Sequence, residues 1–388
     1  MIAGAHHFSL LERVVYGKSV AEVLPAEVER TCALRVFVIS TNSFAGSAAL
    51  QGIEASLGAR YAGVFTDVRA HSPRECIIEG AVAAREARAD LLVAVGGGSA
   101  IDAAKVMLLA LRHGYTDPAQ LDPHAGTILS TTTQRPDDHA QWTRMIAVPT
   151  TFSAAEYTAA GGATQAGTKL KQSFFNQMMV PICVINDPEM TRTAPLSLLK
   201  STGMKAVDHA VERITSLTAN LYCDTVSTLA LKLLARGLPE LDQRPDDLEL
   251  RAELQYGVFM SMAGIAAGVR SNLSHAIAHS MGSLCDVPHG HTTGLLLPST
   301  LRWIGDVLGD ERRRMICEAM GATGVDAAGA VAGLVARLGM PSRLRDVGVR
   351  EQDLSVIAER TLHDPLTANC IRKVESAAQV REVLEMAW

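Results

Sequence analysis

Histidines gather in two short stretches of this 388-residue chain, GMKAVDHAVE and SHAIAHSMGSLCDVPHGH. Lys205 and His209 stand four residues apart and therefore share one face of a helix, as do His275 and His279. His289 follows fourteen residues after His275, past a Gly and a Pro that turn the chain back. A lone helical histidine is usually a solvated or hydrogen-bonded side chain, but three at these spacings favour a metal or catalytic cluster. Imidazole nitrogens favour zinc, iron or nickel over magnesium.

A glycine loop offers a second kind of chemistry. Directly after the apolar run LLVAV the chain continues with Gly96, Gly97, Gly98 and Ser99. Glycines let a backbone approach a pyrophosphate closely, and the N-terminus of the helix that follows offers unpaired N–H groups to an anion. A plain strand-to-helix turn needs only one or two glycines. Because Asp102 and Lys105 also stand on the first turns of that helix, we favour dinucleotide binding, although the GxGxxG fingerprint is absent.

A second loop, PTTFSAAE, also follows a strand-like run. The hydroxyls of Thr150 and Thr151 can bond to phosphate or carboxamide groups, and Phe152 is a candidate substrate contact. The same residues also fit a helix N-cap, with Ser153 and Glu156 as a capping box. Both interpretations can hold together.

The elements that must position these residues differ between the two halves of the chain. In the first half, short β-rich runs alternate with helical stretches, which predicts βαβ units and a parallel sheet. Strands are expected at 35–40, 90–96, 145–150 and 181–187, and helices at 47–58, 75–89 and 100–111. After residue 188 the apolar residues follow helical spacing.

The sequence thus predicts an α/β nucleotide-binding domain over residues 1–192 and an all-α domain over 193–388, with the active site in the cleft between them. The polar, Pro-punctuated segment 115–141 is expected to be an irregular surface excursion.

Composition excludes several classes of protein. Charged residues make up 20% of the chain, the formal net charge is −5, and no basic cluster recurs, so nucleic acid is not an expected partner. The seven cysteines are scattered and lack CxxC spacing, which argues against disulfides or a thiolate zinc site and favours the cytoplasm. No run of about 18 apolar residues is present, so no membrane span is expected.

Five motifs in order resemble the group III iron-containing alcohol dehydrogenase superfamily: VAVGGGSAIDAAK, PTTFSAAE, INDPEMTRTAP, STGMKAVDHAVE and SHAIAHSMGSLCDVPHGHTTGLLLP. The resemblance implies NAD(P)H as cofactor, a small-molecule substrate and a homodimer. It also implies three histidine ligands for a metal, His209, His275 and His289, and places His279 beside the nicotinamide.

One position departs from the metal-binding pattern. The family's fourth ligand is an Asp, and Lys205 stands in its place. A protonated lysine repels a divalent cation and has no lone pair to donate. Asp208 is expected to point away from the face that carries Lys205 and His209, and so not to replace the missing ligand. We therefore expect the metal to be absent or weakly bound.

The maleylacetate reductases, a branch of the same superfamily, also lack that Asp, and their PTTxxxSE loop resembles the loop here. By analogy we expect a reductase of maleylacetate or a related keto acid or enone that does not require metal. Lys205, with His209, His275 and His289 as hydrogen-bond donors, would stabilise the charge that builds on the substrate oxygen, and His279 would position the nicotinamide or relay a proton. Arg270 is a candidate anchor for a substrate carboxylate, or else a member of a surface ion pair.

The nucleotide preference follows from one further position. Asn42 and its neighbours come after the first strand, where an acidic residue would hold the ribose of NAD and exclude NADP. None is present there, so NADPH should be tolerated.

Three alternatives stay open at this point. The first is an iron- or zinc-dependent alcohol or aldehyde dehydrogenase of the same superfamily, in which His209, His275 and His289 hold the metal. The second is a lyase resembling dehydroquinate synthase, and the third is a non-catalytic nucleotide-binding homologue.

Overall fold

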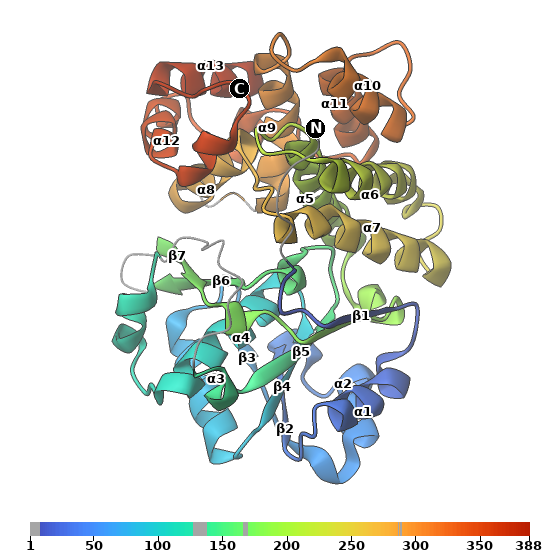
Figure 1. Cartoon of the computed structure of the whole chain (residues 1–388), viewed down its shortest axis with the longest axis vertical. Coiled ribbons are helices and arrows are strands. Elements are labelled where there is room, and N and C mark those ends of the chain that lie inside the picture. Colours follow the sequence, from blue (N-terminus) through green and yellow to red (C-terminus); the bar gives the residue numbers. More distant parts are fainter. Residues whose placement is uncertain (1–7, 127–137, 166–169, 286, 288) are drawn as a thin grey trace. The chain divides into compact units, whose positions relative to one another are not determined.

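The structure, a computed structural model, describes residues 8–126, 138–165, 170–285, 287 and 289–388. Within them the chain forms two compact units, residues 8–194 and residues 195–388. The first unit is an α/β unit and the second is helical, as Figure 1 shows. The predicted fold class is confirmed in both halves.

Parallel strands form the centre of the first unit. They occur in the order β1 (Arg13–Tyr16), β8 (Cys183–Asn186), β5 (Arg144–Pro149), β4 (Leu91–Gly96), β2 (Val36–Thr41) and β3 (Tyr61–Val68). All neighbouring pairs run in the same direction, so their carboxyl ends meet at one edge of the sheet. Strand β4 is buried at every position, as expected for a strand that is covered on both faces.

Helices cover both faces of this sheet (Figure 1). They are α1 (Val20–Arg30), α2 (Ala48–Leu57), α3 (Arg74–Glu86) and α4 (Gly98–His113). The apolar stripes of α1 and α2 pack against alternate residues of the central strands, such as Val93 and Val148. This packing holds the sheet in place and, with it, the edge formed by the carboxyl ends of the strands, where the glycine loop lies.

Some elements of the first unit were not predicted. The short edge strand β1 and the bulged strand β3 were missed, as was a hairpin of β6 (Ala160–Gln165) and β7 (Leu170–Phe175). In the predicted excursion the structure describes two short 3₁₀ turns, η3 (Pro118–His124) and η4 (His139–Gln141). Residues 127–137 of that excursion lie outside the described part of the chain.

The second unit is built from helices. They are α5 (Leu196–Ile214), α6 (Leu221–Glu240), α7 (Leu248–Ala266), α8 (Leu273–Cys285), α9 (His289–Trp303), α10 (Asp310–Ala319), α11 (Ala327–Arg337), α12 (Asp353–Leu362) and α13 (Ala377–Ala387). Polar N-caps define several of their starts: Asn220, Asp247 and Asp326 accept hydrogen bonds from the first turns of α6, α7 and α11.

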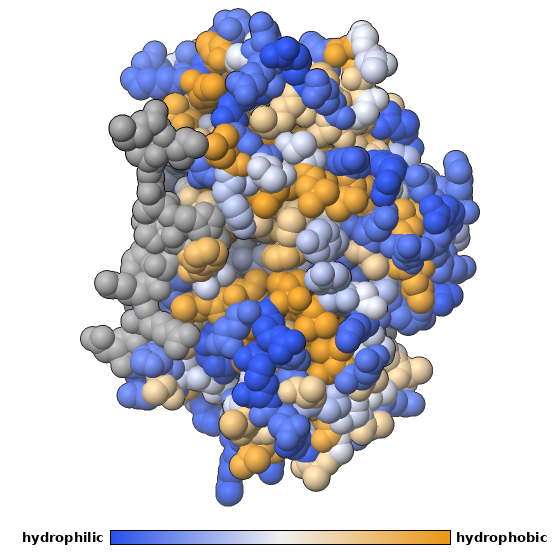
Figure 2. Space-filling view, turned by 45° about the vertical axis from the view of Figure 1, so that its right-hand side comes forward, coloured by the Kyte–Doolittle hydropathy of each residue, from blue (hydrophilic) through white to orange (hydrophobic). Residues whose placement is uncertain are grey.

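Apolar and hydrophilic side chains both reach the surface, and Figure 2 shows them intermixed on one face. Leu217 and Leu221, at the start of α6, are among the exposed large apolar residues. Scattered exposure of this kind is normal for a folded protein. Among the described residues, no helix has the length and apolar character that crossing a bilayer requires.

A buried lysine holds the loop that follows β5. Lys105, on α4, is fully buried, and its Nζ donates to the carbonyl oxygens of Ala155 and Ala160 at 2.5 and 2.8 Å. It also lies 3.3 Å from Thr158 Oγ1. Lys105 therefore fixes the backbone of residues 155–160, which is a different role from the phosphate contact that its position in the sequence indicated.

Replacing this lysine should destabilise the first unit. In Lys105→Met two partly buried carbonyls lose their hydrogen-bond donor, and we expect the free energy of unfolding to fall by about 1–3 kcal/mol. Urea unfolding measures the change, with Lys232→Met on the exposed side of α6 as the control, which should stay within about 0.5 kcal/mol of wild type. Equal midpoints for the two variants would contradict this role.

Candidate active site

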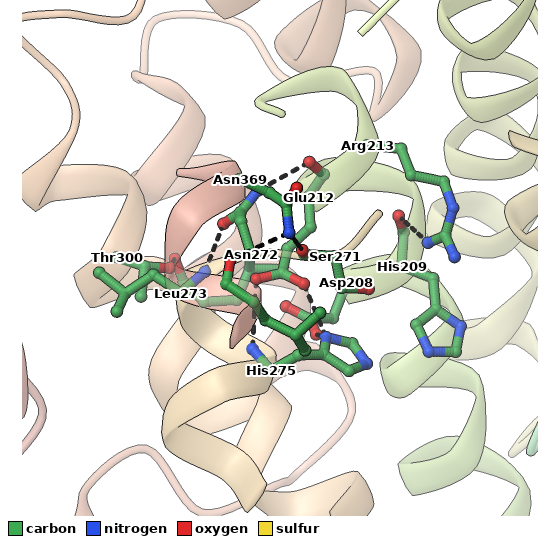
Figure 3. Close-up of polar contacts among 12 residues, drawn as sticks. Asp208, His209, Glu212, Arg213, Ser271, Asn272, Leu273, His275, Thr300 and Asn369 are labelled. Carbon is green, nitrogen blue, oxygen red and sulfur yellow. Dashed lines mark hydrogen bonds and ion pairs between the residues drawn. The ribbon is translucent and has the colours of Figure 1, made fainter. Parts of the chain in front are cut away.

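Two of the predicted histidines come together in the helical unit. His209 on α5 and His275 on α8 are both buried, and their rings stack with centroids 4.7 Å apart and planes 25° apart. His275 and His279 follow one another along α8, and their rings meet edge to face at 6.4 Å. Figure 3 shows the first pair with the carboxylates that surround His275.

The Glu212 carboxylate fixes His275 at two points. Its Oε1 accepts a hydrogen bond from the backbone N–H of His275 at 3.2 Å, and its Oε2 lies 2.7 Å from the ring nitrogen Nδ1. The backbone group belongs to the first turn of α8, where N–H groups lack helical partners and a negative charge is favoured. Glu212 therefore both caps α8 and orients the His275 ring. Next to it, the Asn272 side chain donates to the Glu212 carbonyl at 2.8 Å.

Asp208 completes this cluster, a role that the sequence analysis did not assign to it. Its Oδ2 lies 2.7 Å from His275 Nδ1, the same distance as Glu212 Oε2. The prediction considered only the helix face of Lys205 and His209, and sequence alone could not show that His275 of α8 also meets Asp208 and Glu212. Glu212 was missed altogether. The spacing of Asp208 and Glu212, four apart in DHAVE, was the signal that could have found it.

Burial and charge shift the pKa values of all three groups. Burial together with the charge of Glu212 raises the pKa of Asp208 to about 6. Burial opposes ionisation of Glu212 as well, but the charge of His275 and its hydrogen bonds leave the Glu212 pKa lowered. Burial also disfavours a charged His275, yet the two carboxylates outweigh it and raise the His275 pKa to about 9. The cluster therefore holds a proton on His275 at neutral pH.

The three ligand atoms of Asp208, Glu212 and His275 lie within 4.8 Å of one another, close enough to suggest a metal site. Ligands of one tetrahedral zinc stand about 3.4 Å apart, because each lies roughly 2.1 Å from the ion. Here His275 Nδ1 lies 2.7 Å from both carboxylates, which is a hydrogen-bonding distance. In this arrangement Glu212 pairs with Nδ1 of His275, and Asp208 lies beside the same nitrogen.

The structure describes the side chains of some, but not all, of the other predicted residues of this unit. Lys205 is half-buried on α5, one helical turn before His209. Arg270 is half-buried just before α8 begins. His279 is half-exposed, and its Nδ1 lies 2.9 Å from Asp364 Oδ2. The side chain of His289 lies outside the described part of the structure.

In the α/β unit, the two predicted phosphate loops touch. The Thr150 N–H donates to the Gly96 carbonyl at 3.1 Å. A Cβ added at Gly97 would lie 3.1 Å from Thr151 Cγ2, and one added at Gly98 would lie 3.3 Å from Ser153 Oγ. Gly96 has φ +149°, which only glycine adopts readily. The two loops thus form one small-residue surface at the carboxyl ends of β4 and β5, next to the N-terminus of α4.

The remaining predicted residues of this unit divide into two groups. Ser99 and Asp102 are half-buried on the first turns of α4, and Asn42 is exposed just after β2, so all three lie near the edge of the sheet where parallel strands end. Phe152 is completely buried, which favours a packing role over the predicted contact with a substrate.

Comparison with known proteins decides the family. The model for iron-containing alcohol dehydrogenases matches residues 12–188, and the model for the C-terminal domain of that family matches residues 200–388. The chain belongs to the iron-containing alcohol dehydrogenase family. As a member of it, the chain is an oxidoreductase, as the sequence predicted.

Relatives within the family include two kinds of enzyme. Maleylacetate reductase 2 of Cupriavidus pinatubonensis is 31% identical over 82% of this chain and 79% of its own length. The 1,3-propanediol dehydrogenase of Citrobacter freundii is 33% identical over 84% of this chain and 83% of its own length. The crystal structure of maleylacetate reductase from Agrobacterium tumefaciens superposes with a TM-score of 0.83 at 26% identity, covering 100% of this chain and 99% of that one.

The proton on His275 should make stability depend on pH. Its folded pKa, about 9, lies above the value near 6.5 of an unfolded histidine, so the folded state binds more protons between these limits. Stability should therefore fall as pH rises from 6.5 to 9, by at most about 1.4 kcal/mol per pH unit.

The double substitution Asp208→Asn with Glu212→Gln removes both charges that raise the His275 pKa. It should therefore flatten the dependence of the free energy of unfolding on pH between pH 7 and 9. Thermal unfolding in the presence of EDTA, repeated across this pH range, measures the dependence. The surface carboxylates Asp242 and Glu253, which pair with Lys200 and Arg236, provide the matched double control. An unchanged slope in the Asp208/Glu212 variant would contradict the assignment.

Proposed function

We propose that this oxidoreductase is an NAD(P)H-dependent reductase of maleylacetate, or of a related keto acid or enone, that does not require a metal ion. The observation that carries the proposal is Lys205. It stands on α5, one turn before the buried His209, at the position where the family's metal-binding members have a carboxylate ligand. The similarity to maleylacetate reductases over most of the chain supports the substrate class.

The family's metal does not fit the donor set of this chain. An ammonium group has no lone pair for a cation and repels it. His275, a second expected ligand, has its Nδ1 facing Glu212 and Asp208 at 2.7 Å, which leaves Nε2 as its other ring nitrogen, so the misfit rests on Lys205. A positive charge held by the protein can do the electrostatic work of a metal ion, because both stabilise negative charge that develops on a substrate oxygen.

The nucleotide fits the surface formed by the two touching loops. Gly96, Gly97 and Gly98 carry no side chains and let a backbone approach a pyrophosphate closely, and the N–H groups that begin α4 follow directly. Thr150 and Thr151 border this space. A bound reduced nicotinamide supplies the hydride. Because the exposed Asn42 carries no charge, it does not repel the 2′-phosphate of NADPH, and both NADH and NADPH are expected to serve.

The substrate would be held by positive charge in the helical unit. When a hydride adds to the C=C bond of maleylacetate, negative charge builds on the oxygen of the conjugated ketone. Lys205 stabilises that charge, and His209 donates a hydrogen bond beside it. Arg270, just before α8, is the candidate partner for a substrate carboxylate. His279 supplies or relays the proton that completes the reduction.

A metal-dependent alcohol dehydrogenase is the second candidate function. The observation in its favour is the 33% identity to 1,3-propanediol dehydrogenase, which slightly exceeds the identity to the maleylacetate reductase above. In that case Lys205 would have to be deprotonated or turned aside while the histidines bind the ion.

Variants of Lys205 separate the two candidates. With maleylacetate and NADH, Lys205→Ala should lower kcat about 10²- to 10³-fold, the usual effect of removing one group that stabilises an oxyanion. Lys205→Asp should also lose this activity, but it should bind zinc or iron that wild type does not retain, as elemental analysis would show. Lys200→Ala is the matched control, because Lys200 lies on the same helix and pairs with the surface residue Asp242.

The control should stay within about twofold of wild type. A Lys205→Ala enzyme that keeps wild-type turnover would overturn the proposal. Metal bound equally by wild type and Lys205→Asp would favour the metal-dependent dehydrogenase.

A further inference from the structure

The end of α12 and the segment that follows it make three polar contacts with the histidine helix α8 and with Ser271 just before it. Thr361 Oγ1 lies 3.1 Å from Ser280 Oγ, and Asn369 Nδ2 donates to the Ser271 carbonyl at 3.3 Å, as Figure 3 shows for the second contact. Between these two lies the third contact, from Asp364 to His279. No functional residue was predicted from the sequence in this C-terminal segment.

The contact between Asp364 and His279 joins a largely buried carboxylate to a half-exposed ring. Asp364 Oδ2 lies 2.9 Å from His279 Nδ1, and the side chains are 14% and 51% exposed. The other oxygen, Oδ1, accepts the backbone N–H of Leu366 at 2.9 Å and so caps η9 (Pro365–Asn369). Because the cap fixes the carboxylate, Oδ2 is held in place to meet the ring.

This geometry determines which ring nitrogen carries the proton. An ionised carboxylate accepts hydrogen bonds and has none to donate, so Nδ1 must carry the hydrogen that joins the pair. In the neutral ring Nε2 is then the nitrogen with the lone pair. A carboxylate that fixes the tautomer of a histidine in this way recurs in catalytic dyads and triads, where its loss costs mainly kcat.

We propose that Asp364 is a positioning residue of the reductive site, which holds the His279 ring so that Nε2 is the nitrogen that exchanges a proton with the substrate. Nε2 first takes up a proton from solvent, and when it passes that proton to the reduced substrate, the other proton stays on Nδ1, between the ring and Asp364. The inference rests on the proposed function only in giving His279 this proton-transfer role; the hydrogen bond itself is independent of the substrate.

Asp364→Asn tests the proposal because the Leu366 N–H and the His279 Nδ1–H both need an acceptor, whereas an amide side chain has only one oxygen to offer. Asparagine is as good an N-cap as aspartate, so its oxygen should stay on the Leu366 N–H. Its NH₂ group then faces His279 Nδ1 and can only donate to it, which moves the neutral ring's proton to Nε2. We expect kcat to fall about 10- to 100-fold, KM for nucleotide and substrate to stay within about threefold, and Tm to change little.

The ring nitrogens can be observed directly. In ¹⁵N-histidine-labelled protein without substrate, the His279 signal, assigned by its loss in His279→Gln, should report Nδ1–H in wild type and Nε2–H in Asp364→Asn. The matched control is Asp326→Asn, the same change at the N-cap of α11, whose Oδ1 accepts from Gly329 at 2.7 Å. It should leave both the tautomer and kcat unchanged. Should Asp364→Asn not fold, Asp364→Ser keeps a capping oxygen and removes the carboxylate.

The outcomes separate this inference from the proposed function. Rates are measured with whichever of maleylacetate and 1,3-propanediol the wild type turns over, so failure with maleylacetate defeats only the proposed function. If Asp364→Asn keeps the wild-type tautomer or the wild-type kcat, Asp364 is merely a cap and the inference is overturned. A fall in kcat that a matching fall in Tm accompanies would overturn it as well.

Discussion

The helical site depends on the contacts that the buried carboxylate of Glu212 makes. Glu212 comes from α5, yet it caps the first turn of α8 through the His275 backbone and fixes the His275 ring through Nδ1. One side chain thus sets the spacing of two helices and the direction of a functional imidazole. A buried charge of this kind is tolerated only with good partners, and His275, together with the polar groups around Asn272, supplies them. His209 then stacks on a ring that cannot rotate.

The second feature of this site is its positive charge. In the proposed function, Lys205 takes the position of a metal ligand, and His275 retains a proton because two carboxylates face it. In that proposal, both features supply positive charge for an anionic substrate. The carboxylates of Asp208 and Glu212 pair with the buried His275 ring, so its positive charge has partners inside the helical unit.

Sequence predicted the fold well where periodicity is strong. The run LLVAV and the glycines after it gave β4 and the start of α4 within a residue or two, whereas the short β1 and the bulged β3 carry too little pattern to be recognised. In the site, helical spacing correctly grouped Lys205 with His209 and His275 with His279. It could not show which face of α5 meets α8, so Asp208 was dismissed and Glu212 was overlooked. Asp364 lies 85 residues from His279, and only the folded chain brings the two together.

The most direct test of the central claim uses the unmodified enzyme. Wild type is stripped with a strong chelator, its iron and zinc contents are measured, and its rate of NADH oxidation with maleylacetate is compared before and after stripping. We expect less than a tenth of an equivalent of metal and an unchanged rate. A rate that disappears on stripping and returns with iron or zinc would contradict the account, because a cation, and not Lys205, would then stabilise the developing charge.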